Sequence, residues 1–98
     1  MSRTRTYLDW NATAPMRPEA RAAMVEALDV TGNPSSIHAE GRAARALVEA
    51  ARAQVATAAG ASAADVVFVS GATEAAALTC AGRDLSCAPV EHEAVLAW

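Results

Sequence analysis

Residues 70–74, with the sequence SGATE, carry the sharpest chemical signal in the chain. They follow an apolar run and precede a predicted helix, whose first N–H groups have no partner within the helix. Such a turn binds anions, because these N–H groups point outward and the helix dipole favours negative charge. The hydroxyl of Thr73 would add a donor to a phosphate. From the residues alone, an ordinary strand-to-helix turn with Thr73 as the N-cap is the favoured alternative.

The histidines and cysteines offer weaker signals. His92 follows a predicted strand end, where its ring could stack on a flat cofactor or move protons near neutral pH. The alternative without a function is a partly exposed histidine between Glu91 and Glu93, and this alternative is favoured on the residues alone. Cys80 and Cys87 match no zinc-binding spacing, so no metal site is predicted, and Cys80 is interpreted as a buried, inert thiol.

The elements that must position these residues follow from periodicity and from breaker residues. Apolar residues at helical spacing predict a helix from Pro18 to about Asp29 and a longer one ended by Gly60. The run DVVFV predicts a buried strand, which we expect to be parallel. The order of elements predicts an α/β fold with an incomplete sheet. The predicted ranges are helices 18–29, 38–59, 74–81 and 93–98, a strand at 65–69 and another opening at Val90.

Composition excludes several classes of protein. The 98 residues fit one small domain or a piece of a larger one, and alanine supplies about half of the 53% hydrophobic share. Such a chain buries little area and is expected to be weakly stable alone. The net charge of −3 argues against nucleic acid, and no apolar run is long enough for a membrane span. Two thiols without a secretory signal favour a cytoplasmic location.

Five blocks, taken together and in this order, resemble the opening of cysteine desulfurases, which belong to the class V aminotransferase group. Each block has the residue types of that family, and the set covers nearly the whole chain. We therefore expect the N-terminal part of a fold-type I pyridoxal-phosphate-dependent transferase, equal to roughly the first quarter of a full-length member. The blocks are YLDWNATA (7–14), GNPSSIH (32–38), GRAAR (41–45), FVSGATE (68–74) and EHEAVL (91–96).

The resemblance implies a role for particular residues. In cysteine desulfurases the Ala-Thr of the glycine turn binds the cofactor phosphate, which here means Ala72 and Thr73. The histidine of the Glu-His block stacks on the pyridine ring of pyridoxal phosphate, which here means His92. Thr13 and Asn33 are carried over as weaker candidates for the substrate pocket. The resemblance also implies an arm toward the small domain (about 1–15) and the start of the large cofactor domain (about 16–98).

The resemblance implies an enzyme that converts L-cysteine to L-alanine and passes persulfide sulfur to iron–sulfur cluster assembly or other acceptor proteins. Family members hold pyridoxal phosphate on a Schiff-base lysine, use a nucleophilic loop cysteine, and form homodimers. All eight basic residues here are arginine. The lysine and the loop cysteine are expected beyond Trp98, and neither Cys80 nor Cys87 corresponds to the nucleophile. The 98 residues are therefore expected to be inactive alone.

Two departures from the family pattern keep alternatives open. Residues 75–77 are all alanine where the family has polar residues, and the stretch from Glu74 to Glu91 is shorter than usual. Both favour one alternative, a non-catalytic, degenerate relative that acts as an interaction module, with a desulfurase subunit as a candidate partner. Another alternative is a different class V enzyme of this cofactor, such as a selenocysteine lyase, because the specificity residues lie mostly downstream.

Overall fold

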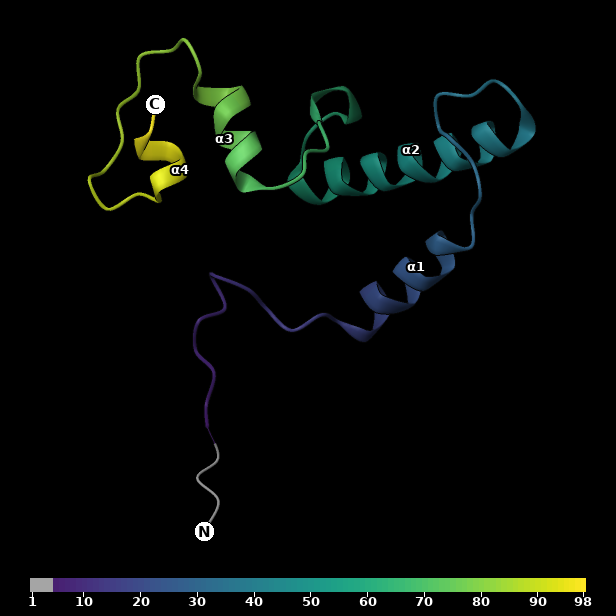
Figure 1. The fold of residues 1–98 in the computed structure, drawn as a ribbon, viewed down its shortest axis with the longest axis horizontal. Helices are drawn as coiled ribbons and strands as arrows, with labels where there is room; N and C mark the ends of the chain where they lie inside the picture. The colour runs from purple at the N-terminus through teal and green to yellow at the C-terminus, as the bar shows by residue number, and fades with distance from the viewer. Residues whose placement is uncertain (1–4) are drawn as a thin grey trace. The chain divides into compact units, whose positions relative to one another are not determined.

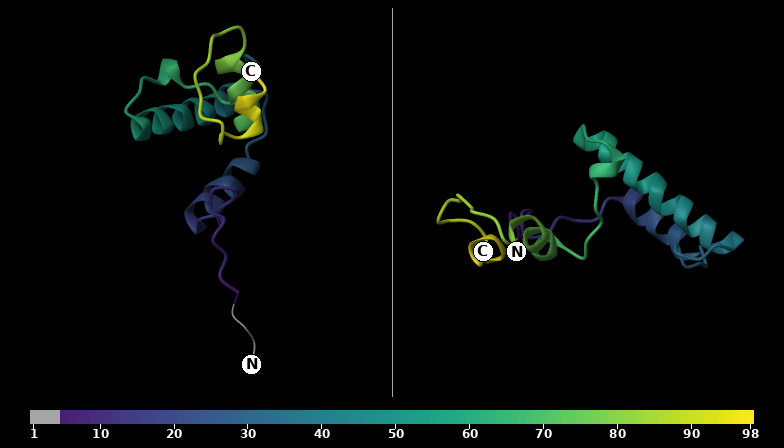
Figure 2. Two further views of the ribbon diagram at one scale, coloured as in Figure 1. Left: turned by 90° about the vertical axis from the view of Figure 1, so that its left-hand side faces the viewer. Right: turned by 90° about the horizontal axis from the view of Figure 1, so that it is seen from above.

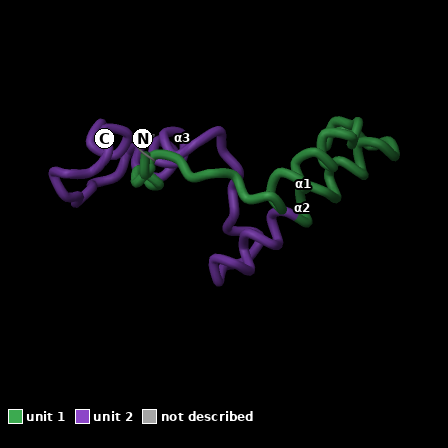
Figure 3. The backbone as a smooth tube through the Cα atoms, turned by 90° about the horizontal axis from the view of Figure 1, so that it is seen from below, with its two compact units in different colours: residues 1–50 green, residues 51–98 purple. Residues whose placement is uncertain are grey.

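The computed structural model describes residues 5–98, which form two compact units. Figure 3 shows the first unit, up to Ala50, in green and the second, from Ala51 to Trp98, in purple. All regular elements within residues 5–98 are helical: four α-helices and one short 3-10 helix (Figure 1). None of these helices is long and apolar enough to cross a membrane.

The first unit contains α1 (Pro18–Leu28) and the beginning of α2 (Ala39–Ala59). Both helices confirm the prediction within one residue at each end. Pro18 occupies the first position of α1, where its fixed φ suits a helix and its missing N–H costs nothing. Alanine-rich sequence favours helix throughout α2, since alanine has the highest intrinsic helix propensity.

A loop of residues 32–38 folds tightly against the start of α2. Gly41 is buried, and a Cβ there would meet the Asn33 carbonyl oxygen at 2.8 Å. The Arg45 side chain donates from Nε to the Pro34 carbonyl oxygen at 2.8 Å. The Arg45 bond holds the loop against the helix. The close approach of the loop backbone to Gly41 is possible only because Gly41 has no side chain.

The second unit continues from the end of α2 through the 3-10 helix η1 (Ala63–Asp65) to residues 66–69. Gly60 ends α2 with φ of 66°, the left-handed C-terminal position predicted for it. Arg52 reaches from α2 to the following segment. Its Nη1 donates to the Val66 carbonyl oxygen, and its guanidinium lies 5.0 Å from the centre of the Phe68 ring.

The predicted strand at residues 65–69 is wrong as regular structure in this chain. Asp65 ends the 3-10 helix, and residues 66–69 are extended but belong to no β-ladder. The side chain of Val67 is 69% exposed rather than buried. The predicted strand at Val90 is a turn. A strand is defined by pairing with a neighbour, and residues 5–98 form no second strand to supply that neighbour. An α/β sheet is therefore not formed by the described residues.

Helices α3 (Ala72–Cys80) and α4 (Glu93–Leu96) complete the second unit and lie side by side. The helix predicted at 74–81 begins two residues earlier, and the one predicted at 93–98 ends two residues earlier. The buried hydrophobic residues described are small: Ala44, Ala56 and Cys80. Burial of Cys80 confirms its prediction, and the small core agrees with the weak stability expected of this composition.

Candidate functional site

The turn that precedes α3 presents unpaired backbone donors. Gly71 is the N-cap, with extended backbone angles (φ 171°, ψ 179°), and Ala72 and Thr73 are the first two residues of the helix. The prediction of Thr73 as N-cap is therefore wrong, because the N-cap is Gly71 and the chain is already helical at Ala72, one residue before Thr73. The first N–H of the turn that reaches a helical carbonyl is that of Ala75, which donates to Gly71 at 3.1 Å. The N–H groups of Ala72 and Thr73 precede it and have no carbonyl of α3 to meet.

The hydroxyl of Thr73 differs from those of the other two helical threonines. Thr57 and Thr79 each donate to the carbonyl oxygen four residues earlier, at 2.9 and 2.7 Å. Thr73 is only the second residue of α3, so the residue four positions before it, Val69, lies outside the helix. The Thr73 hydroxyl and N–H are both exposed at the helix N-terminus, where the dipole favours an anion.

Glu74 links the helix back to the residue that precedes its N-cap. One carboxylate oxygen, Oε2, accepts the Ser70 N–H at 2.7 Å and the Ser70 hydroxyl at 2.6 Å. This is a variant of the capping box, in which a glutamate at the third helical position accepts a backbone N–H from before the helix. The hydrogen bonds from the Ser70 hydroxyl and from its N–H hold the pKa of Glu74 below its ordinary value of 4.5.

Acid should weaken this turn. The folded-state pKa of Glu74 is lowered, so the unfolded chain binds the proton more readily and stability rises with pH in this range. The contribution of Glu74 is present above its ordinary pKa of 4.5 and is lost as the pH falls through the lowered value. An NMR pH titration that follows the Glu74 carboxyl carbon and the Ser70 amide in parallel measures both the protonation of Glu74 and the loss of its hydrogen bond to Ser70. Independent titration of the two signals would contradict the hydrogen bond.

His92 is the N-cap of α4. Its Nδ1 accepts the Ala94 N–H at 3.1 Å, so Nδ1 must be unprotonated and the neutral ring carries its proton on Nε2. The cap fixes one edge of the ring and leaves the exposed ring otherwise uncommitted. His92 follows a turn rather than the predicted strand, but its ring is held by backbone geometry all the same.

The packing of α3 against α4 brings two of the predicted site segments to one end of the second unit. Figures 1 and 2 show both helices running in the same direction, so the two N-termini lie at the same end. Thr73 stands at the beginning of one helix and His92 at the beginning of the other. The helix start with unpaired backbone donors and the exposed His92 ring therefore share one end of a helix pair.

The two weaker candidates belong to the first unit, and their closeness to the turn remains a prediction. The Thr13 N–H donates to Asp9 at 3.3 Å, and its carbonyl oxygen accepts the Tyr7 hydroxyl at 3.0 Å. Asn33 Oδ1 accepts the Ser35 N–H at 2.9 Å, which is an Asx-turn. In the structure, both residues shape their own loops.

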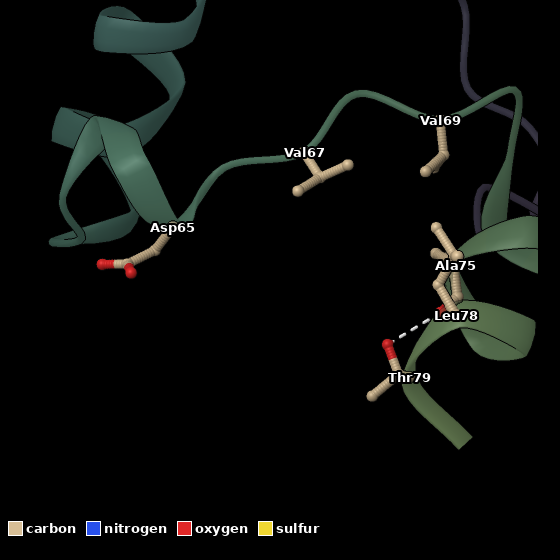
Figure 4. Close-up of a pocket in the computed structure, with 6 residues that line it drawn as sticks. All are labelled: Asp65, Val67, Val69, Ala75, Leu78 and Thr79. Atoms are coloured by element: carbon tan, nitrogen blue, oxygen red, sulfur yellow. Dashed lines mark hydrogen bonds between the residues drawn. The ribbon is translucent and has the colours of Figure 1, made fainter. Parts of the chain in front are cut away.

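A depression of about 480 Å³ lies on α3 and the extended segment before it (Figure 4). Its lining is mostly apolar and includes none of Ala72, Thr73 and His92. The Thr79 hydroxyl at its edge is already bonded to Ala75. The lining residues are Asp65, Val67, Val69, Ala75, Leu78 and Thr79. No group of three or more acidic, histidine or cysteine side chains within residues 5–98 is placed to hold a metal ion.

Comparison with known protein families decides the relationship. The model of the family "Aminotransferase class-V" matches residues 6–97, nearly the whole chain. The chain belongs to the class-V aminotransferase family. Enzymes of this family use pyridoxal phosphate. No solved structure matches the chain.

The most similar relatives include cysteine desulfurases. The chain is 43% identical over 100 residues to "Cysteine desulfurase IscS" of Dictyoglomus turgidum, which covers 92% of this chain and 25% of that protein. It is 44% identical over 103 residues to "Cysteine desulfurase" of Cereibacter sphaeroides, covering 95% and 27%. It is 42% identical over 71 residues to human "Selenocysteine lyase", covering 71% and 16%. The chain thus spans about a quarter of the length of these desulfurases.

Sequence reasoning missed the role of Ser70 and Glu74. It treated both as parts of a motif and assigned neither a contact. The signal was present, because a serine followed by a glutamate around a helix start is the usual sign of a capping box. The tight approach at Gly41 was also missed, since the pattern of neighbouring residues does not reveal what packs against a glycine.

Proposed function

We propose that these residues are the cofactor-phosphate segment of a cysteine desulfurase whose full-length form converts L-cysteine to L-alanine. The observation that carries the proposal is the turn at residues 71–73, where exposed backbone donors and the Thr73 hydroxyl lie at a helix start within a class-V aminotransferase sequence. Matches to desulfurases over more than nine-tenths of the chain support this substrate class. The persulfide sulfur would pass to acceptor proteins, including those of iron–sulfur cluster assembly.

The residues present fit the phosphate of pyridoxal phosphate. Ala72 and Thr73 would donate their N–H groups to it, and the Thr73 hydroxyl would donate a further hydrogen bond. His92, fixed at Nδ1 by its cap on Ala94, would present its ring face to the pyridine ring. When bound, pyridoxal phosphate supplies an electron sink for the amino acid's Cα electrons. The task of these residues is to bind and orient it.

The chain has no lysine, so a covalent link to the cofactor requires a lysine outside these 98 residues. We propose that residues outside this segment supply that lysine and the nucleophilic cysteine, and that a homodimer forms in the cytoplasm. Cys80 is buried and Cys87 exposed, and both are free thiols, as suits a reducing compartment.

A chimera tests the proposal directly. These 98 residues are placed in the Dictyoglomus turgidum desulfurase in exchange for the quarter that matches them. We expect L-alanine to form from L-cysteine when pyridoxal phosphate is supplied. Thr73→Val should weaken the affinity of the chimera for pyridoxal phosphate about tenfold, because one hydrogen bond to a charged group is lost.

Thr79→Val is the matched control in this experiment. It removes a hydroxyl from the same helix, but that hydroxyl bonds only the helix's own Ala75 carbonyl oxygen in the structure. We expect cofactor affinity to stay within twofold of the unsubstituted chimera, about 0.4 kcal/mol. A folded chimera that binds no pyridoxal phosphate would support the non-catalytic, interaction-module alternative instead.

A selenocysteine lyase is the second candidate, motivated by the similarity to the human protein of that name. The discriminating measurement is the ratio of kcat/KM for L-selenocysteine to that for L-cysteine in the full-length protein that contains these residues. A desulfurase uses both substrates at comparable efficiency or favours cysteine. Turnover of selenocysteine alone would assign the lyase activity.

A further inference from the structure

We infer that Glu74 is a positioning residue for phosphate binding. Its side chain fixes the conformation of the turn at residues 70–73 and does not contact the anion itself. The inference rests on the proposed function and adds a residue to the site. It starts from one contact: a single oxygen of Glu74 accepts both donors of Ser70, at 2.7 and 2.6 Å.

The geometry separates the carboxylate from the donors that an anion needs. Glu74 is the third residue of α3, and its side chain folds back past Thr73 and Ala72 to a residue outside the helix. A glutamate free at this position would be drawn to the unpaired N–H groups of its own helix start, because they carry partial positive charge. Ser70 instead engages Oε2, so Ala72 and Thr73 keep their N–H groups available.

The same contact fixes the path of the chain into the helix. Gly71 is extended and a Cβ there would meet nothing within 4 Å, so neither side-chain packing nor glycine geometry restrains this residue. The two bonds from Ser70 to Glu74 span the turn from one side of Gly71 to the other. Without them, the N–H groups of residues 71–73 would sample many directions and would bind an anion less well.

Two opposite predictions distinguish positioning from charge. If Glu74 acted only through its negative charge, its removal would strengthen the binding of any anion nearby. If it positions the turn, its removal weakens binding, and a neutral acceptor of the same shape restores it. Glutamine keeps an oxygen that can accept from Ser70, whereas alanine keeps none.

The test measures binding of pyridoxine 5′-phosphate, which has the phosphate of the cofactor but no aldehyde, to the chimera that carries these 98 residues, after its pyridoxal phosphate has been removed. Amide shifts of Ala72 and Thr73 in NMR titrations report the site. We expect E74A to bind about threefold to tenfold more weakly, equal to the loss of one or more ordinary hydrogen bonds, and E74Q to bind at least as well as the unsubstituted chimera. Glu19→Ala, at a glutamate in the first turn of α1, is the control and should change nothing.

Each of the other outcomes contradicts a specific part of this inference. Equal or tighter binding by E74A, with helix content unchanged by circular dichroism, overturns the positioning role and leaves the proposed function standing. E74Q as weak as E74A overturns the acceptor role of the side chain. If E74A loses its helix, Ser70→Ala decides, since it removes one donor and should weaken binding by a smaller factor than E74A. An unsubstituted chimera that shows no shift at Thr73 overturns the anion site and this inference together.

Discussion

Replacement of Gly41 with alanine should loosen residues 32–38 from the start of α2 by about 1–3 kcal/mol, the usual cost of overpacking. A Cβ at this position would contact the Ser36 carbonyl oxygen and would lie 2.7 Å from the Ser36 Cβ and 2.8 Å from the Asn33 carbonyl oxygen. Two of these three atoms are backbone, so no side-chain rotation relieves the clash. The loop must move away from the helix.

Amide hydrogen exchange measures this effect at the loop itself. The Ser36 N–H donates to Asn33 at 2.9 Å, and its exchange should become about fivefold to a hundredfold faster in the variant. Gly71→Ala is the matched control, because a Cβ there would meet nothing within 4 Å and the backbone is extended. We expect that control to change stability by less than about 0.5 kcal/mol. Equal effects at both glycines would contradict the close approach at Gly41.

Replacement of Arg52 with methionine should free residues 66–69, which lead into the turn before α3. The variant keeps an apolar stem and loses the bond to the Val66 carbonyl oxygen and the stacking on Phe68. A hydrogen bond from a charged group contributes about 1.5–3 kcal/mol, and an exposed cation–π contact about 0.5–1 kcal/mol. Together these contributions come to about 2–4 kcal/mol; because Phe68 is half exposed, solvent screening reduces them, and we expect a loss of about 1–2 kcal/mol.

NMR order parameters of residues 66–69 report this loss, together with urea unfolding followed by circular dichroism. We expect the backbone order parameters to fall toward about 0.6, the value typical of flexible segments. Arg42→Met is the control on the same helix, because Arg42 donates to the Ile37 carbonyl oxygen at 2.6 Å and touches a different loop. Arg52→Lys should recover only part of the loss, since an ammonium lacks the planar guanidinium. Unchanged order parameters at residues 66–69 in the methionine variant would show that the Arg52 contacts with Val66 and Phe68 do not restrain this segment.

Much of the local structure, including the position of the SGATE segment at a helix start, could be predicted from residue types. Pro18 marks the start of α1 and Gly60 the end of α2, because proline and glycine restrict or permit particular backbone angles. The SGATE segment was correctly placed at a helix start. The N–H groups at that position are unpaired in any helix, so their availability also follows from the sequence. These features depend on interactions within about four residues, and such interactions can be read from neighbouring positions.

The tertiary structure decided the rest. Residues 66–69 have the β-branched and aromatic composition of a strand, but a strand forms only against a partner, and none is present within residues 5–98. The packing of α3 against α4 brings Thr73 and His92 to one end, which no local pattern specifies. The sequence by itself determined the helices and the position of the turn at a helix start, because both are local. Only the three-dimensional arrangement decided that residues 66–69 find no strand partner within residues 5–98 and that α3 packs against α4, because those contacts join segments that are not neighbours in the sequence.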